Sequence, residues 1–121
     1  MENIYLGLRT LIHKVKDLKA ATVWYSQILG VAPYFDEPFY VGFNVGGYEL
    51  GLQPVEEGES PVSVTYWGVE NVEKTYTELL ESGAKPYEIP TDVGSGIVVA
   101  TVIDPFGHLL GIIYNPHFSL S

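Results

Sequence analysis

The chain has no cysteine and few basic residues. Its 121 residues include six Lys plus Arg against fifteen Asp plus Glu, which gives a formal net charge of −9. Without cysteine the chain can form no disulfide, no thiolate metal site and no cysteine nucleophile, and we expect a cytoplasmic protein. Six cations cannot build the basic face that nucleic acid requires, so we expect no nucleic-acid partner.

Long hydrophobic runs are also missing. Hydrophobic residues make up 46% of the chain, yet no run approaches the ~18 apolar residues that a membrane helix needs. The segment 1–5 contains an acid and lacks the basic start and apolar core of a signal peptide. We therefore expect no membrane partner. A chain of this length has room for one domain with a real core.

The segment Asp104-Pro105-Phe106-Gly107 has the residue preferences of a type I turn. Apolar and β-branched residues precede it over 97–103 and follow it over 109–114, so we expect a β-hairpin. A second hairpin is expected over 40–52. It repeats the first at an offset of 60, with Asn44, Gly47 and Gly51 in the places of Asp104, Gly107 and Gly111. The chain is therefore a duplication.

Each half of the chain begins with a strand and continues with a helix. The first strand is expected over 6–15 and its counterpart over 62–69. Helices are expected to begin at the caps Asp17 and Asn71 and to end at Gly30 and Gly83. Their apolar stripes are Leu18, Ala21, Tyr25, Ile28 and Leu29 in the first helix and Val72, Tyr76, Leu79 and Leu80 in the second. A weak strand is expected after each helix, near 31–34 and near 85–89.

The predicted fold is α+β, with two tandem βαβββ modules in one domain of residues 1–121. The modules cover about 5–55 and 62–116, and the acidic, proline-bounded segment 54–61 links them. A sheet with one helix on one face leaves its other face uncovered. Two modules can cover their open faces by bringing these faces together, which predicts a curved mixed sheet around a central cleft.

Several segments resemble the vicinal oxygen chelate superfamily, which includes glyoxalase I, extradiol dioxygenases, fosfomycin-modifying enzymes and bleomycin resistance proteins. The resemblance covers essentially the whole chain. It rests on Val15-Lys16-Asp17-Leu18, Trp24-Tyr25, Ile28-Leu29-Gly30, Trp67-Gly68-Val69-Glu70-Asn71-Val72, Leu79-Leu80, Gly83-Ala84 and Asp104-Pro105-Phe106-Gly107.

This resemblance implies a divalent metal held at four equivalent positions, two in each half, where family enzymes use His, Gln or Glu. In this sequence those positions hold Thr10 and Val64 on the first strands and Gly51 and Gly111 on the last strands. None of the four can act as a usual metal ligand. We therefore expect no metal and no cofactor.

Other catalytic or metal-binding patterns are weak. His13 has the opposite strand parity from Thr10 and should face the helix or the sheet edge, while His108 lies in the turn and His117 in the C-terminal tail. Glu49 and Gln53 share the parity of Gly51, and a weak metal site built from these two remains an alternative. No phosphate-binding glycine loop and no nucleophile elbow occurs.

Residues with inward parity make up the candidate ligand site, which is mostly apolar with two glycine-sized gaps. We expect ligand contacts from Thr10, Ile12, Glu49, Gly51, Gln53, Val64, Tyr66, Leu109, Gly111 and Ile113, and also from the aromatic Trp67 near the mouth of the cleft. Further aromatic residues expected near the mouth of the cleft are Phe35, Phe39, Tyr40 and Tyr48.

Two classes of function fit this sequence. The first is a metal-free protein of the sequestration or resistance type that binds a small hydrophobic or aromatic molecule. Because Glu49 is the acid with inward parity and the chain is strongly acidic, a neutral or cationic ligand suits it best. The second is a lyase, isomerase or dioxygenase with an atypical or metal-independent site and Glu49 as base. A partner-binding module is a third alternative, and the uncovered sheet faces predict a homodimer.

Overall fold

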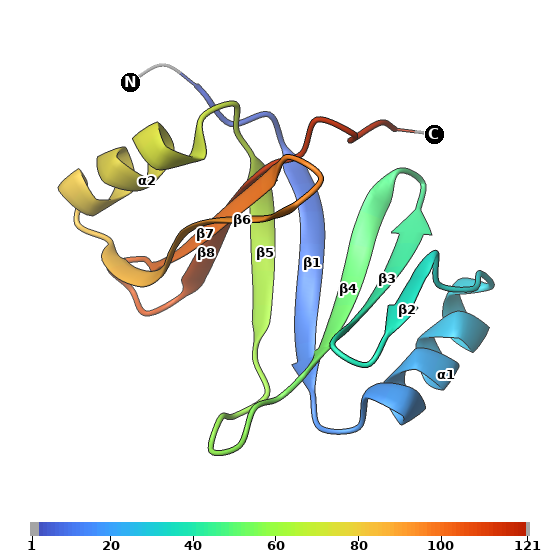
Figure 1. Cartoon of the computed structure of the whole chain (residues 1–121). Coiled ribbons are helices and arrows are strands. Elements are labelled where there is room, and N and C mark those ends of the chain that lie inside the picture. The colour runs from blue at the N-terminus through green and yellow to red at the C-terminus, as the bar shows by residue number, and fades with distance from the viewer. Residues whose placement is uncertain (1–2, 121) are drawn as a thin grey trace. The chain divides into compact units, whose positions relative to one another are not determined.

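The computed structural model describes residues 3–120, and within that range the chain forms eight strands and two helices (Figure 1). The elements follow one another as β1 (Leu8–Val15), α1 (Leu18–Leu29), β2 (Phe35–Glu37), β3 (Tyr40–Val45), β4 (Tyr48–Pro54), β5 (Ser63–Gly68), α2 (Val72–Glu81), β6 (Lys85–Gly94), β7 (Ile97–Ile103) and β8 (Leu109–Tyr114). The order strand, helix, strand, strand, strand occurs twice. The predicted α+β fold of tandem βαβββ modules is therefore confirmed.

The chain divides into two compact units, which we name after their helices. The α1 unit comprises residues 10–64 and 119–120, and the α2 unit comprises residues 3–9 and 65–118. In the α1 unit the strand order is β2-β3-β4-β1, with β1 parallel to β4. In the α2 unit the order is β5-β8-β7-β6, with β5 parallel to β8. Both units thus use the same arrangement, as a duplicated sequence requires.

Both helices start at the predicted caps. The Asp17 side chain accepts a hydrogen bond from the Ala20 N–H, and the Asn71 side chain accepts one from the Lys74 N–H, each at 3.0 Å. Helix α1 ends at Gly30, whose φ of 70° lies in the left-handed region. Neither helix among residues 3–120 is long and apolar enough to cross a membrane.

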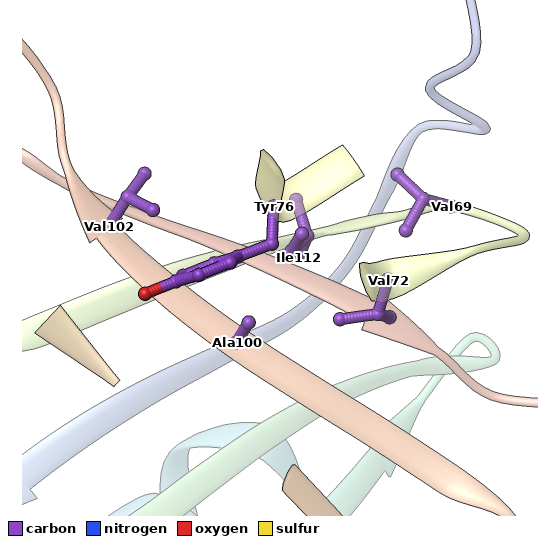
Figure 2. Close-up of a cluster of buried hydrophobic side chains, with 6 residues drawn as sticks. All are labelled: Val69, Val72, Tyr76, Ala100, Val102 and Ile112. Atoms are coloured by element: carbon purple, nitrogen blue, oxygen red, sulfur yellow. The ribbon is translucent and has the colours of Figure 1, made fainter. Parts of the chain in front are cut away.

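Each helix packs one face on the sheet of its own unit. In the α2 unit the buried cluster consists of Val69, Val72, Tyr76, Ala100, Val102 and Ile112, which Figure 2 shows converging between α2 and the sheet. In the α1 unit, Leu18, Ala21, Tyr25 and Leu29 pack on the buried side chains of Val41, Phe43 and Leu52. The prediction that Ile28 joins this stripe is wrong. Ile28 is 62% exposed, because it follows Trp24 by one helical turn on the outer side of α1.

The two glycine-containing hairpin turns form as predicted. At the β7–β8 turn the Gly107 N–H donates to the Asp104 carbonyl at 3.1 Å, and the Asp104 side chain accepts from the backbone N–H groups of Phe106 and His108. These hydrogen bonds, the one from His108 above all, lower the pKa of Asp104. At the β3–β4 turn the Asn44 side chain accepts from the Gly47 N–H at 3.0 Å. Both side chains therefore have structural roles.

The strand predicted near 31–34 is wrong. The structure places β2 at Phe35–Glu37, paired with β3 through Phe35 and Gly42. Pro33 lies in the predicted segment and has no N–H to donate to a strand partner. The next residue, Tyr34, donates its N–H to the Gly42 carbonyl at 3.0 Å and so leads the chain into β2.

Candidate functional site

The packing of α1 on its sheet shows which residues lie on the face of that sheet away from the helix. On β4, Leu50 and Leu52 pack toward α1, so Glu49, Gly51 and Gln53 lie on the face away from it. His13 on β1 stacks on Tyr25 of α1 with ring centroids 6.0 Å apart, as its parity predicts. Its Nδ1 also lies 2.6 Å from the Ser63 hydroxyl.

The strand register then brings four predicted site residues together. Thr10 pairs with Glu49 and Ile12 pairs with Gly51 across the parallel strands β1 and β4. All four lie on the face away from α1. Gln53 lies two residues further along the same side of β4, and Val64, from the β5 part of this unit, is buried.

Glu49 is the centre of a hydrogen-bonded cluster. The Tyr34 hydroxyl donates to Glu49 Oε1 and the Tyr40 hydroxyl donates to Glu49 Oε2. Partial burial of the Tyr34 hydroxyl, followed by its hydrogen bond to Glu49 and the charge of that carboxylate, raises the pKa of Tyr34 well above its usual range. Glu49 itself is half-buried. Two neutral donors thus hold a carboxylate in a fixed orientation.

Glycine makes room for both tyrosines. A Cβ atom at Gly51 would overlap the Tyr40 hydroxyl and come within 2.8 Å of its ring, and a Cβ atom at Gly42 would lie 3.0 Å from the Tyr34 ring. The tyrosines therefore occupy the space that side chains at these positions would fill. Glycine at 51 is required by this close approach.

Two phenylalanines extend the aromatic surface around Glu49. The Phe35 ring lies 5.9 Å from the Phe39 ring and 6.1 Å from the Tyr40 ring, between centroids. Phe39 is 65% exposed and Tyr34 62% exposed. We call Tyr34, Phe35, Phe39 and Tyr40 the aromatic cluster. Phe35, Phe39 and Tyr40 were expected at a ligand site from the sequence.

Sequence reasoning missed Tyr34. It lies in the proline-punctuated connection after α1, where no periodicity assigns a residue to a face. The signal that could have found it is Gly42, since a glycine in the middle of a strand often marks close approach of another group.

The α2 unit contains a second tyrosine over a glycine. Tyr66 of β5 pairs with Gly111 of β8, and a Cβ atom at Gly111 would lie 2.6 Å from the Tyr66 ring. Tyr66 is buried and shares a hydrogen bond with the Thr101 side chain, and burial raises the pKa of its hydroxyl.

The other predicted site residues of this unit are divided between two faces. Leu109 and Ile113 lie on the same side of β8 as Gly111, and Ile113 is buried. Trp67 follows Tyr66 directly in β5 and therefore lies on the opposite face. There it makes an edge contact with Tyr5 at 6.3 Å between ring centroids, and Tyr5 packs against the helix-side core. The structure thus separates Trp67 from Tyr66, Gly111 and Ile113.

The sequence-family model for the Glyoxalase/Bleomycin resistance protein/Dioxygenase superfamily matches residues 11–112 of the chain. The chain belongs to this superfamily. No curated protein sequence matches it. The resemblance read from the sequence is therefore confirmed at the level of the family.

Solved structures of family members share the fold. Methylmalonyl-CoA epimerase from Mycobacterium tuberculosis is 16% identical, with 96% of this chain and 93% of that chain covered and a TM-score of 0.72. The Mn(II)-bound glyoxalase from Novosphingobium aromaticivorans is 16% identical, with 97% of this chain and 41% of that chain covered and a TM-score of 0.76. Homoprotocatechuate 2,3-dioxygenase from Brevibacterium fuscum is 18% identical over 95% of this chain and 38% of that chain, at a TM-score of 0.72. The chain therefore spans less than half the length of the last two.

The residues of this chain do not fit the metal that the fold family implies. Thr10, Val64 and the two glycines stand at the four positions that the sequence resemblance assigns to metal ligands, and tyrosine rings fill the space in front of Gly51 and Gly111. Of the other candidates, His108 contacts Asp104, and His117 contacts the Ser95 carbonyl through Nε2 at 2.9 Å. Within residues 3–120 no three His, Asp or Glu side chains gather closely enough to hold a metal ion.

Proposed function

We propose that the protein binds a small hydrophobic or aromatic molecule without a metal, as a sequestration or resistance-type member of its superfamily. The observation that carries the proposal is the tyrosine over a glycine in each unit. At Gly51 and at Gly111, a metal ligand would have to displace Tyr40 or Tyr66. The face away from α1 offers an apolar and aromatic surface with one fixed carboxylate instead, which is the usual composition of a small-molecule site.

Elemental analysis and a binding screen test this proposal together. We expect no stoichiometric Zn, Mn, Fe or Ni in purified protein, and no change of melting temperature on treatment with a chelator. We also expect aromatic compounds to shift the NMR signals of Tyr34, Phe39 and Tyr40. One tightly bound divalent cation per chain would contradict the metal-free reading. A screen with no hits at these residues would contradict the binding function.

A lyase, isomerase or dioxygenase activity is the second candidate. Its support is the fixed, half-buried carboxylate of Glu49, since a carboxylate is one of the groups that can act as a general base. For this candidate, Glu49→Gln should reduce turnover of a substrate by about 10²-fold or more, the usual contribution of a general base. Turnover unchanged in Glu49→Gln would rule Glu49 out as the base.

We propose a cytoplasmic location, which suits a chain without cysteine. We also propose that the protein forms a homodimer.

A further inference from the structure

The carboxylate of Glu49 has acceptor capacity left over. An ionised carboxylate offers about four acceptor sites, and the hydroxyls of Tyr34 and Tyr40 take one on each oxygen. Both tyrosines are neutral donors, so the negative charge stays uncompensated by them. The ion pairs among residues 3–120 are Lys14 with Glu59 and His108 with Asp104, and neither involves Glu49.

The basic residue on this face of β1 is engaged elsewhere. Lys14 lies on β1 with the parity of Thr10 and Ile12, but its Nζ is 3.7 Å from Glu59 Oε2. Glu37 pairs with Tyr40 across β2 and β3 and so adds a second acid on the same face. The field around Glu49 is therefore negative, in a chain whose net charge is −9.

The aromatic cluster presents rings beside this carboxylate. Phe39 and Tyr34 are well exposed, and Phe35 stands between Phe39 and Tyr40. The face of an aromatic ring attracts a cation through its quadrupole, and it also covers the apolar body of a ligand. A carboxylate and several ring faces in one place favour a cation that has an apolar body.

We propose that Glu49 and the aromatic cluster bind an organic cation, with an amidinium or ammonium head on Glu49 and an apolar body on Phe35, Phe39 and Tyr34. This rests on the proposed binding function and names the chemical class of its ligand. A planar amidinium can donate one N–H to each carboxylate oxygen, which matches the acceptor sites that the two tyrosines leave.

Three probes of one shape but different charge test the class. Benzamidinium, benzamide and benzoate are titrated at pH 7 and low salt, with NMR signals of the tyrosine and phenylalanine rings as readout. We expect benzamidinium to bind about tenfold more tightly than benzamide, and benzoate to bind most weakly. Raising the salt concentration should weaken benzamidinium alone, because salt screens charge attraction.

Matched variants locate the effect. Glu49→Gln should weaken benzamidinium about tenfold and benzamide by less than about threefold, whereas Glu57→Gln, which removes the same charge from an exposed position of this unit, should change neither by more than about twofold. If Glu49→Gln does not fold, Phe39→Ala tests the proposal instead, because removing the exposed Phe39 ring leaves no cavity. It should weaken benzamidinium about threefold or more.

The outcomes separate this proposal from the binding function. Equal binding of benzamide and benzamidinium at the aromatic cluster would overturn the organic cation and leave small-molecule binding in place. Equal effects of Glu49→Gln and Glu57→Gln would also overturn it. If Phe39→Ala halves the mass of the protein in solution, the cluster is a contact between copies and the proposal is wrong. No shift from any probe would overturn it as well.

Discussion

At the scale of single residues, two glycines determine what the sheet faces can hold. Gly51 and Gly111 stand at positions that the sequence resemblance assigns to metal ligands, and the absence of a side chain alone would leave a gap at each. The structure fills both gaps with tyrosine, Tyr40 at Gly51 and Tyr66 at Gly111. Each glycine and its tyrosine therefore fit together, and a side chain added at the glycine should displace the tyrosine ring.

Gly111→Ala should destabilise the fold by about 1–3 kcal/mol, the usual cost of overpacking a core. Its Cβ atom would lie 2.6 Å from the ring of Tyr66, which is only 6% exposed and cannot turn away. Gly42→Ala is the matched control. Its Cβ atom would meet the Tyr34 ring at 3.0 Å, but that ring is exposed and can shift slightly without leaving Glu49, so we expect a loss below about 1 kcal/mol. Denaturant midpoints of the two variants measure the difference, and equal losses would contradict the prediction.

The Tyr34 hydroxyl should ionise at a higher pH than the hydroxyl of a free tyrosine. Its pKa is raised by partial burial and by the Glu49 carboxylate, and an ordinary tyrosine has a pKa of about 10. A pKa raised in the folded state gives stability that is complete below about pH 10 and is lost as the pH rises through the folded value. Glu49→Gln should lower the pKa of Tyr34 and leave only the part caused by burial.

Carbon-13 NMR of labelled tyrosine follows this ionisation, and Tyr34→Phe assigns the signal. If the Tyr34 signal in native protein titrates together with that of unfolded chain, the hydrogen bond to Glu49 is absent in solution.

At the scale of elements, the sequence predicts features that depend on neighbouring residues better than features that depend on strand pairing. Asp17, Asn71 and Gly30 identify the ends of the helices because caps are local features of the chain. The outward position of Ile28 depends on how α1 packs on the sheet, and the start of β2 at Phe35 depends on its pairing with β3. The sequence pattern shows neither of these contacts. Trp67 was assigned to the ligand site although it adjoins Tyr66 in a strand, where neighbours must face opposite ways.

Gly30→Ala should destabilise the protein by about 1 kcal/mol, because its φ of 70° lies in the region that a Cβ atom disfavours. No heavy atom lies within 4 Å of the position of that Cβ, so the cost comes from the backbone alone. Gly30→Asn is the control, since asparagine tolerates this conformation and should cost less. Thermal melting compares the variants. An alanine variant as stable as the asparagine variant would mean that α1 ends in another way in solution.

At the scale of the whole molecule, the sequence predicts the duplication and the family but not the partners of Glu49. The duplicated hairpins and the paired helix caps are periodic features that one sequence reveals. The hydrogen bonds from Tyr34 and Tyr40 join the connection after α1 and strand β3 to strand β4, and only the assembled unit shows them.

The outer side of α1 is suited to a second copy of the chain. Trp24 and Ile28 lie there one helical turn apart, Val23 adjoins Trp24 in the sequence, and all three are exposed. The helix contains no acid, so two copies of a chain with a net charge of −9 can approach each other at this surface. Its last turn also lacks a basic residue. An antiparallel pair of helices would bring Lys19 of one copy beside the C-terminal end of the partner's helix, where a positive charge is favourable.

We therefore expect a homodimer with a two-fold axis through this helix pair. Light scattering should approach twice 13.4 kDa as concentration rises, because a helix pair of about 18 Å buries less surface than a permanent interface needs. Val23→Glu should weaken association by about 2 kcal/mol or more, since it places an unpaired charge in the contact. Val93→Glu on β6 is the matched control, because Val93 is 58% exposed against 59% for Val23. A mass that stays at 13.4 kDa over a hundredfold range of concentration would exclude the dimer, and equal effects of the two variants would place its contact elsewhere.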